Sequence, residues 1–319
     1  MNFEILGTGS YVPEHVVTNE DLSKIVDTSD EWITERTGIR QRRIAVAEAT
    51  HDLAYEAAKA ALADANVEPN ELDMILCATI SSDLASPSTA IMVQKMLGTT
   101  CPAMDISAAC SGFVYTLDVA AGFFARGKVK KMLVIGAERL SKMLDWEDRT
   151  TCVIFADGAG AVVLGEGEAY LSSKLTTKGD DDVIKIPNHI GISPFSTLEE
   201  EKPCINMKGR EVFKFAVNAM CNDVKEVLEQ AGLNQQDVSY VIPHQANLRI
   251  IDSVRRKMEI APEKYCHNIE KYGNTSSASI PLVLDELNKE GKLKTGDYLV
   301  FSAFGGGLTT GACVIQWTK

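Results

Sequence analysis

The sequence of 319 residues predicts an α/β fold built from two similar halves. Two observations support this: apolar runs that alternate with helical patterns, and an internal repeat. The apolar runs lack strict alternation, as expected for strands buried on both faces, and they are Met74–Ile80, Leu133–Ala137, Val238–Ile242 and Tyr298–Ala303. Helical patterns lie between them, at His51–Asn66 and Glu211–Ala231. Such alternation of strands with helices is typical of largely parallel sheets.

The internal repeat has an offset of 166 residues. A helix, a turn and a strand read ALADANVEPNELDMIL in the first half and VLEQAGLNQQDVSYVI in the second. Asp73 then aligns with Ser239 (239 − 73 = 166) and Leu133 with Leu299 (299 − 133 = 166), so one register serves two strands of each half. The alternative is chance similarity between generic helix–strand units. We interpret the repeat as an internally duplicated fold.

The repeat also sets the expected boundaries of the two halves, at 1–170 and 171–319. DGAGAVVLGE at 157–166 and TTGACVIQW at 309–317 resemble each other as final strands, although the offset shrinks there. The stretch 170–210 is weakly patterned, and we expect it to be a solvated hairpin or loop insertion.

Composition excludes several classes of function. The net charge of −12 and the pI of about 5.0 disfavour nonspecific nucleic-acid binding, which depends on cationic surface. No apolar run reaches the roughly 18 to 20 residues needed to span a bilayer, and no secretory signal pattern is present. The eight cysteines form no CxxC pair. This pattern favours free thiols in the cytoplasm and argues against a zinc site or another metal site.

Cys110 is the first candidate for chemistry. It lies where a strand is expected to end and a buried, apolar helix over Ser111–Arg126 to begin. The unpaired N–H groups at a helix N-terminus should lower the pKa of a thiol and stabilise the thiolate. The alternative is that a lone cysteine on a buried helix serves only as a small apolar side chain.

The repeat brings other residues into the argument. The 166-residue register aligns Cys110 with Ser276, and it aligns Ala78 with His244. Cys110, His244 and Asn274 are each expected to follow a strand, and ligand crevices in open α/β sheets lie at the carboxyl ends of strands. FGGG at 304–307 is a fourth loop of this kind, with bare backbone N–H groups. Each residue alone has a structural explanation; together they predict one site.

Six motifs extend over the whole chain and resemble one family, the β-ketoacyl-acyl carrier protein synthase III enzymes of type II fatty-acid synthesis. The motifs are TSDEWITERTGI at 28–39, ACSGF at 109–113, DGAGA at 157–161, HQANLRI at 244–250, GNTSSASIP at 273–281 and FGGGLT at 304–309. The resemblance implies the thiolase-like fold, with two pseudo-symmetric α/β halves, mixed but largely parallel central sheets and an αβαβα order of layers.

The resemblance also implies a decarboxylative Claisen condensation. Cys110 would take an acyl group from an acyl-CoA, and His244 and Asn274 would donate hydrogen bonds to the thioester carbonyl of malonyl-acyl carrier protein as CO₂ leaves. The backbone N–H groups of Cys110 and Gly306 would form the oxyanion hole. The CoA thioester is a substrate, no cofactor is implied, and a homodimer is expected.

The family's binding residues carry over by position. Four are expected to bind CoA: Thr28, Trp32, Arg36 and Arg149. Four are expected to bind the carrier protein: Lys214, Arg249, Arg256 and Lys257. Ser86 and Phe304 are expected at the acyl pocket, Ser86 in the pocket of the partner subunit. Short-chain-specific members have a bulky aromatic at the position of Ser86, which predicts a pocket open to primers longer than acetyl. Thr310 departs from the family, which often has Trp there.

Three other functions compete with this one. A papain-like cysteine protease also orders Cys, His and Asn, and the gap of 134 residues (244 − 110) falls in its range, but its CG(S/A)C(W/Y) signature is absent. A related condensing enzyme or acyltransferase of a specialised pathway would use the same triad with a different acceptor. A noncatalytic acyl-CoA-binding scaffold would have little use for Cys110 beside His244 and Asn274.

Overall fold

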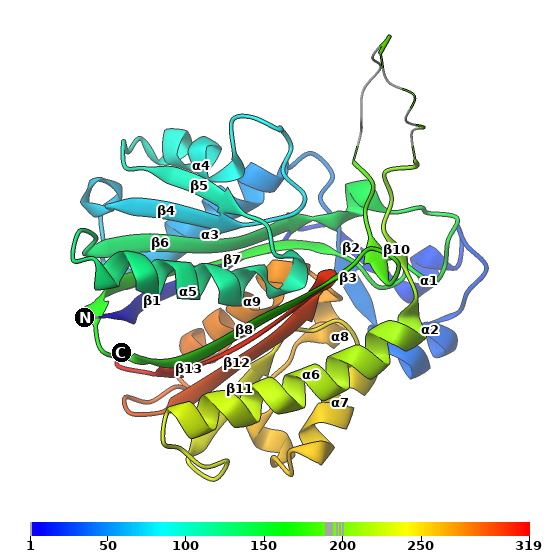
Figure 1. The fold of residues 1–319 in the computed structure, drawn as a ribbon. Helices are drawn as coiled ribbons and strands as arrows, with labels where there is room; N and C mark the ends of the chain where they lie inside the picture. The colour runs from blue at the N-terminus through cyan, green and yellow to red at the C-terminus, as the bar shows by residue number, and fades with distance from the viewer. Residues whose placement is uncertain (1, 189–193, 196, 198, 200) are drawn as a thin grey trace.

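The computed structural model describes residues 2–319 except 189–193, 196, 198 and 200. The chain forms five layers in the order α, β, α, β, α, with one sheet on each side of a central helical layer (Figure 1). The predicted thiolase-like layering is therefore confirmed. The helices of the outer layers are α3 (Thr50–Ala65) and α4 (Thr89–Leu97) on one side, and α6 (Gly209–Gln230) and α7 (Leu248–Lys257) on the other. The central layer contains α5 (Gly112–Ala125) and α9 (Ser279–Lys289).

The first sheet has five strands in the order β1-β7-β6-β4-β5, and the second has four in the order β8-β13-β12-β11. The strands of the first sheet are β1 (Asn2–Tyr11), β4 (Met74–Ala78), β5 (Ala103–Ile106), β6 (Lys131–Arg139) and β7 (Asp157–Gly167). Those of the second are β8 (Tyr170–Asp180), β11 (Val238–Pro243), β12 (Tyr298–Gly305) and β13 (Gly307–Gln316). Within the described residues, the two orders match except that β5 has no equivalent strand, only a bridge between Val241 and Tyr265.

Both sheets are mixed, as expected, but parallel pairs do not predominate. Pairing is parallel for β4–β5, β4–β6 and β11–β12, and antiparallel for β1–β7, β6–β7, β12–β13 and β8–β13. The sequence pattern did not show this because all these strands lie between helical layers. A strand buried on both faces has the same apolar composition in either direction.

Residues on β6 show how one strand serves two layers. Met132 and Val134 pack into the central cluster with α5 and α9, whereas Leu133 and Ile135 pack against α3. All four are fully buried. The apolar run of β6 is therefore continuous because alternate residues contact different helical layers.

The observed helices agree with the predicted ones to within two residues. α3 and α6 correspond to the helices predicted at 51–66 and 211–231, and α5 corresponds to the helix predicted at 111–126. Gly127 follows α5 with a φ of 66°, in the left-handed region that often ends a helix. The boundary predicted at residue 170 stays a prediction. α5 and α9, one from each predicted half, belong to one apolar cluster together with strands of both sheets.

The 166-residue register is one residue out at the functional turns. Cys110 lies in the 3₁₀ turn η2 (Ala109–Ser111), and its equivalent turn is η5 (Ser276–Ala278), 167 residues later. Within these turns Cys110 matches Ser277 and not Ser276. The alignment of Ala78 with His244 is also one residue out, in the opposite direction. Ala78 pairs with Gly136 and Pro243 pairs with Ser302, so Ala78 matches Pro243 (243 − 78 = 165). A sequence alignment without gaps cannot represent an offset that changes along the chain.

Shorter elements cover the carboxyl ends of the two sheets. They are β2 (Val16–Thr18), α1 (Asn19–Leu22), α2 (Asp30–Thr37), β3 (Gln41–Arg43), α8 (Ile269–Tyr272) and the 3₁₀ turn η3 (Leu140–Met143), whereas the 3₁₀ turns η1 (Pro69–Glu71) and η4 (Pro262–Lys264) lie at the amino ends of β4 and β11. Ile33, Leu140, Val153 and Ile269 bury the apolar side of this cover. It surrounds the entrance to the site described below.

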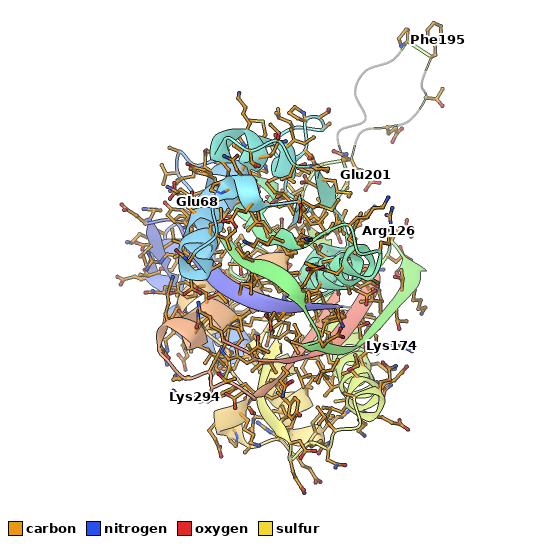
Figure 2. All side chains as sticks on the ribbon, turned by 90° about the vertical axis from the view of Figure 1, so that its left-hand side faces the viewer. Glu68, Arg126, Lys174, Phe195, Glu201 and Lys294 are labelled. Atoms are coloured by element: carbon orange, nitrogen blue, oxygen red, sulfur yellow. The ribbon has the colours of Figure 1, made fainter. Side chains whose placement is uncertain are left out.

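The stretch 170–210 contains the long strand β8 and the short antiparallel pair β9 (Ile184–Lys185) and β10 (Asn206–Met207). The hairpin prediction is thus confirmed for β9 and β10, while β8 belongs to the second sheet. Phe195, between β9 and β10, lies far from the packed body and is 95% exposed (Figure 2). No helix in the described part of the chain is long and apolar enough to cross a membrane.

Gly136→Ala tests the contact between the halves. A Cβ at Gly136 on β6 would lie 2.4 Å from the carbonyl oxygen of Ser277 in η5, so the backbone of one half must move. We expect the free energy of unfolding to fall by about 1–3 kcal/mol, as for other overpacked positions, and we expect urea denaturation to show it.

Gly122→Ala is the matched control for this change. Nothing lies within 4 Å of a Cβ at Gly122, which is an exposed position of α5. Alanine there should leave stability unchanged or raise it by up to about 1 kcal/mol through helix propensity. Equal stability of the two variants would contradict a tight contact between β6 and η5.

Candidate active site

The predicted catalytic residues line one cavity of about 410 Å³. Cys110 enters it from η2, His244 from the loop after β11, and Gly306 from the turn after β12. Asn274 also lines it, but it follows the short helix α8, so the expectation that a strand precedes it was wrong. In the C-terminal half, α8 leads to Asn274, whereas in the N-terminal half the strand β5 leads to Cys110.

Cys110 is partly buried at the start of α5. Burial raises the pKa of its thiol to about 12; Ser276 opposes this shift and the carboxyl of Glu138 adds to it. The expected stabilised thiolate is therefore not found: removal from water outweighs the helix N-terminus. The resting group is a thiol, and its proton must go to an acceptor when the sulfur attacks.

His244 is buried and uncharged. Its Nδ1 lies 2.8 Å from the Ser279 hydroxyl, and its Nε2 is buried with no hydrogen-bond partner in the described structure. Burial lowers the pKa of the imidazole to about 3. The Ser279 hydroxyl also lies 2.8 Å from the Ser276 carbonyl oxygen, so its one proton goes either there or to Nδ1. When Nδ1 accepts that proton, Nε2 carries its own N–H into the cavity.

Asn274 is held by its backbone and by one side of its amide. Its N–H donates to the Ile154 carbonyl and its own carbonyl accepts from the Ala156 N–H, each at 2.9 Å. Its Oδ1 accepts a 2.8 Å hydrogen bond from the Ser276 N–H. With the acceptor end engaged, the NH₂ end of Asn274 is the group available to a ligand, as a donor.

Gly305 lets the turn after β12 approach Cys110. A Cβ at Gly305 would lie 2.7 Å from the Cys110 backbone nitrogen and 3.1 Å from the Ala109 Cβ. The turn can pass this close only without a side chain, and Gly306 beside it lines the cavity. Cys110 and Gly306, whose backbone N–H groups are the predicted oxyanion donors, therefore both line this cavity, and their role stays a prediction.

A second cavity, of about 700 Å³, leads from the surface towards the first. The two share four lining residues, which are Met207, Val212, Ala246 and Asn274. Trp32, Arg36 and Arg149 line the second cavity, as the CoA prediction requires, but Thr28 does not. The Thr28 hydroxyl oxygen is buried and has no hydrogen-bond partner in the described structure.

Two guanidinium groups lie close to the Trp32 ring. The guanidinium carbons of Arg36 and Arg149 lie 4.5 Å and 5.1 Å from its ring centroid. Arg149 also donates a 2.8 Å hydrogen bond to the Asp27 carbonyl. An indole face beside guanidinium groups suits a nucleotide with phosphates.

Lys214, Arg249, Arg256 and Lys257 are all exposed, on α6 and α7. Only Arg249 lines the second cavity. Arg256 lies 3.9 Å from Asp252, and Lys257 donates to the Asn218 amide oxygen at 3.1 Å.

The two acyl-pocket candidates differ. Phe304 is 2% exposed, lines the first cavity and contacts the His244 ring edge-on, with the centroids 5.4 Å apart. Ser86 is exposed and does not line that cavity. Thr310 is buried on β13 and lines neither cavity. No described group of His, Cys, Asp and Glu has the arrangement of a metal site.

Sequence reasoning missed two contributors to the site. Arg210, the second residue of α6, is exposed and lines the second cavity. The only sign of it in the sequence was the basic segment MKGRE at the start of the predicted helix. Glu138 is fully buried near Cys110, whereas a charged residue at the end of a strand usually indicates solvent.

The fold and these loops define a condensing acyltransferase of the thiolase-like class. Two family models match the chain: "3-Oxoacyl-[acyl-carrier-protein (ACP)] synthase III" over residues 104–179, and its C-terminal part over 228–317. A β-ketoacyl-[acyl-carrier-protein] synthase III of Clostridium acetobutylicum is 51% identical, with 99% of each chain covered. The chain belongs to the β-ketoacyl-acyl carrier protein synthase III family.

Solved structures agree with this assignment. The crystal structure of the 3-oxoacyl-[acyl-carrier-protein] synthase III from Aquifex aeolicus is 50% identical with a TM-score of 0.93, covering 99% of this chain and 100% of that one. The priming β-ketosynthase of the R1128 polyketide pathway is 32% identical with the same TM-score of 0.93, covering 100% of this chain and 97% of that one.

Gly305→Ala should impair the site in protein that is still folded, which circular dichroism verifies. Its Cβ would press on the Cys110 backbone nitrogen, and loss of one oxyanion donor typically lowers kcat about 10²–10³-fold. We expect a loss of that size in the rate of Cys110 acylation, measured by release of CoA. Gly179→Ala is the control, because nothing lies within 4 Å of a Cβ there. An unimpaired Gly305→Ala enzyme would argue against this placement of the oxyanion hole.

Proposed function

We propose that this protein condenses an acyl-CoA primer with malonyl-acyl carrier protein to give 3-ketoacyl-acyl carrier protein, CoA and CO₂. The observation that carries the proposal is a single cavity lined by one thiol and by two neutral groups that can donate hydrogen bonds. Cys110 supplies the thiol, and His244 and Asn274 supply the donors. The step would initiate fatty-acid synthesis and needs no cofactor besides the two substrates.

In the first half-reaction Cys110 attacks the acyl-CoA thioester. The backbone N–H groups of Cys110 and Gly306 stabilise the tetrahedral oxyanion, and CoA leaves. Arg36, Arg149 and the indole of Trp32 hold the nucleotide at the mouth of the second cavity, while the pantetheine arm reaches inward. Arg149 already lies over Trp32, so we expect it to move aside when an adenine stacks there.

In the second half-reaction a malonyl thioester loses CO₂. Nε2 of His244 and the amide of Asn274 donate to its carbonyl oxygen and stabilise the enolate, whose carbon then attacks the acyl-Cys110 thioester. No basic side chain has to remove a proton from carbon, because decarboxylation generates the nucleophile. The low pKa of His244 fits this task, since the group must be a neutral donor rather than a cation.

Basic residues around the entrance suit an acidic carrier protein. Arg249 lines the second cavity, and Lys214, Arg256 and Lys257 are exposed on the two neighbouring helices. The whole chain has a net charge of −12, so this local basic surface would orient an anionic partner that is otherwise repelled. All eight cysteines are free, which fits our assignment of the reaction to the cytoplasm.

Exposed apolar side chains support a homodimer. Leu84, Ile91 and Met104 are 45%, 41% and 39% exposed, in and around α4 and the edge strand β5. An open strand edge with apolar neighbours is a common pairing surface. Ser86 lies in the same region, so a second copy would bring its Ser86 towards the other acyl pocket.

A condensing enzyme of a specialised pathway is the second candidate, since the R1128 priming β-ketosynthase shares the fold at 32% identity. Identities near 50% to β-ketoacyl-acyl carrier protein synthase III proteins favour fatty-acid synthesis. Use of malonyl-CoA in preference to malonyl-acyl carrier protein would favour the specialised pathway.

Acylation of Cys110 is the direct test of the proposed function. Mass spectrometry after mixing the protein with acyl-CoA should show one acyl adduct on Cys110, which malonyl-acyl carrier protein then converts to 3-ketoacyl product. Cys110→Ala should form no adduct, while Asn274→Ala should form it but condense at least about 10²-fold more slowly. A wild-type protein without an adduct would favour the noncatalytic acyl-CoA scaffold, and peptide hydrolysis would favour a protease.

The primer is tested with a panel of acyl-CoA thioesters from two to eight carbons. With Ser86 small, chains longer than acetyl should react at comparable or higher kcat/KM, and Ser86→Phe should shift the preference towards acetyl. Sedimentation of the same samples establishes whether the partner subunit is present. A strong preference of the wild-type enzyme for acetyl-CoA would contradict the open pocket.

A further inference from the structure

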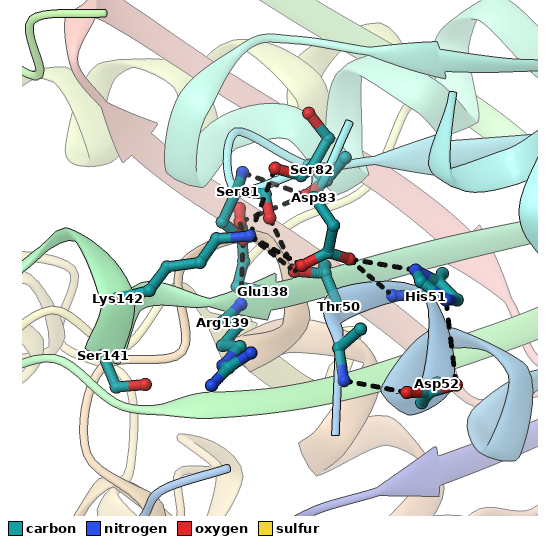
Figure 3. A network of polar contacts seen from close by, with 12 residues as sticks. Thr50, His51, Asp52, Ser81, Ser82, Asp83, Glu138, Arg139, Ser141 and Lys142 are labelled. Atoms are coloured by element: carbon teal, nitrogen blue, oxygen red, sulfur yellow. Dashed lines mark hydrogen bonds and ion pairs between the residues drawn. The ribbon is translucent and has the colours of Figure 1, made fainter. Parts of the chain in front are cut away.

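Glu138 is a fully buried carboxyl group at the carboxyl end of β6. Its Oε2 accepts hydrogen bonds from the Ser81 hydroxyl at 2.6 Å and the Ile80 N–H at 3.2 Å. Figure 3 shows Glu138 within the polar network formed by the loop after β4. All of its hydrogen bonds in the described structure come from neutral donors. A carboxyl group kept in the core without a cation is costly, and such groups are concentrated at functional sites.

The other carboxyl oxygen of Glu138 faces the active site. Its Oε1 accepts from the hydroxyls of Ser276 and Ser277, each at 3.1 Å. Ser276 lines the same cavity as Cys110, and its side chain interacts with the Cys110 thiol so as to lower the pKa of that thiol. A hydroxyl that donates to a carboxylate has its lone pairs free to accept, so the thiol proton has a path to Glu138.

We propose that Ser276 and Glu138 form a proton relay that accepts the Cys110 proton during acylation. The inference rests on the proposed function, because it concerns the thiol that takes the acyl group. Glu138 acts through Ser276 and has no contact with the substrate.

His244 is the weaker acceptor for this proton. Its Nδ1 is engaged with Ser279, and burial holds its pKa near 3. Burial instead raises the pKa of Glu138 to about 7, although its hydroxyl and N–H donors oppose the shift. The thiol and the carboxyl also disfavour each other's charge, because Glu138 raises the pKa of Cys110. At neutral pH the thiol therefore keeps its proton, and Glu138 is the group of the pair that titrates.

The relay balances over the half-reaction. The S–H bond of Cys110 breaks as its sulfur bonds to the acyl carbon, the thiol proton passes to Ser276, and the Ser276 proton passes to Glu138. The electron pair on the oxyanion then re-forms the carbonyl and expels the CoA thiolate. Glu138 returns its proton through Ser276 to that sulfur, so free CoA leaves as the thiol and Glu138 is again an anion.

Other ionisable groups also lie around Glu138. Cys77 on β4 is fully buried and its pKa is raised by burial. On the far side of the loop after β4, Lys142 pairs with Asp83 at 2.8 Å, and Asp83 contacts His51 at 3.0 Å (Figure 3). Arg139 follows Glu138 along the chain, and its backbone N–H donates to the Ser81 hydroxyl at 2.8 Å.

The pH dependence of acylation tests the relay. Glu138 accepts a proton only as the anion, so the rate of CoA release from a fixed acyl-CoA should rise as pH increases through about 7, where Glu138 ionises. Glu138→Gln should lower that rate about 10²-fold at pH 7.5 and remove the rise near pH 7, because a general base typically contributes 10²–10⁴-fold. Ser276→Ala should have the same two effects, and the double variant should be no worse than either.

Ser277→Ala is the matched control, because it removes a hydroxyl from the same Oε1 without interrupting the path to Cys110. It should keep the rise, displaced slightly to higher pH. Circular dichroism verifies each fold, and Ser276→Ala decides alone if Glu138→Gln does not fold. A wild-type adduct on Cys110 with the rise intact in Glu138→Gln or Ser276→Ala overturns the relay and leaves the condensation proposal standing. Absence of any wild-type adduct overturns both.

Discussion

The close approach of two backbone turns is the constraint on which the active site depends. η2 and η5 come from opposite halves, and each contains a non-glycine residue with positive φ, Ala109 at 48° and Ser276 at 50°. Such strained positions persist only where the surroundings fix them. Here the surrounding contacts are possible only because glycine has no side chain. A Cβ at Gly136 would lie 2.4 Å from the Ser277 carbonyl oxygen, and one at Gly112 would lie 3.1 Å from the Ala78 Cβ. The packing of the two halves therefore sets the position of Cys110.

Charge is separated along the path into the protein. The entrance has exposed guanidinium groups on Arg36, Arg149 and Arg210. The inner residues His244 and Cys110 are uncharged at neutral pH, because the pKa of His244 is near 3 and that of Cys110 is near 12. Anionic phosphates can thus stay at the surface while a thioester reaches the interior. A poorly solvated interior also favours loss of CO₂, because the localised charge of the malonyl carboxylate becomes the more delocalised charge of the enolate.

The sequence was sufficient for the buried strands, the long helices and the loops around Cys110, because each has a local pattern or motif. It was insufficient where a property depends on several segments at once. The pKa of the thiol depends on burial by both halves, and Glu138 is enclosed by residues from the β4 loop and from η5. The register is one residue out at the functional turns, where β5 leads to η2 in one half and α8 leads to η5 in the other.

The duplication also explains why only one of the two equivalent turns carries a nucleophile. Ser277 occupies in η5 the place that Cys110 has in η2, but it is 1% exposed, donates to the Ala78 carbonyl at 2.9 Å and does not line the cavity. The cavity is lined by Cys110 in η2, whereas Ser276 lines it from η5 and Ser277 does not, so a thiol at position 277 would not reach a substrate. What η5 contributes is hydroxyl groups, and Ser276 and Ser277 both bond Glu138. One of the two equivalent turns thus holds the reacting atom, and the other supplies hydrogen-bonding groups beside it whose positions are fixed by the opposite half.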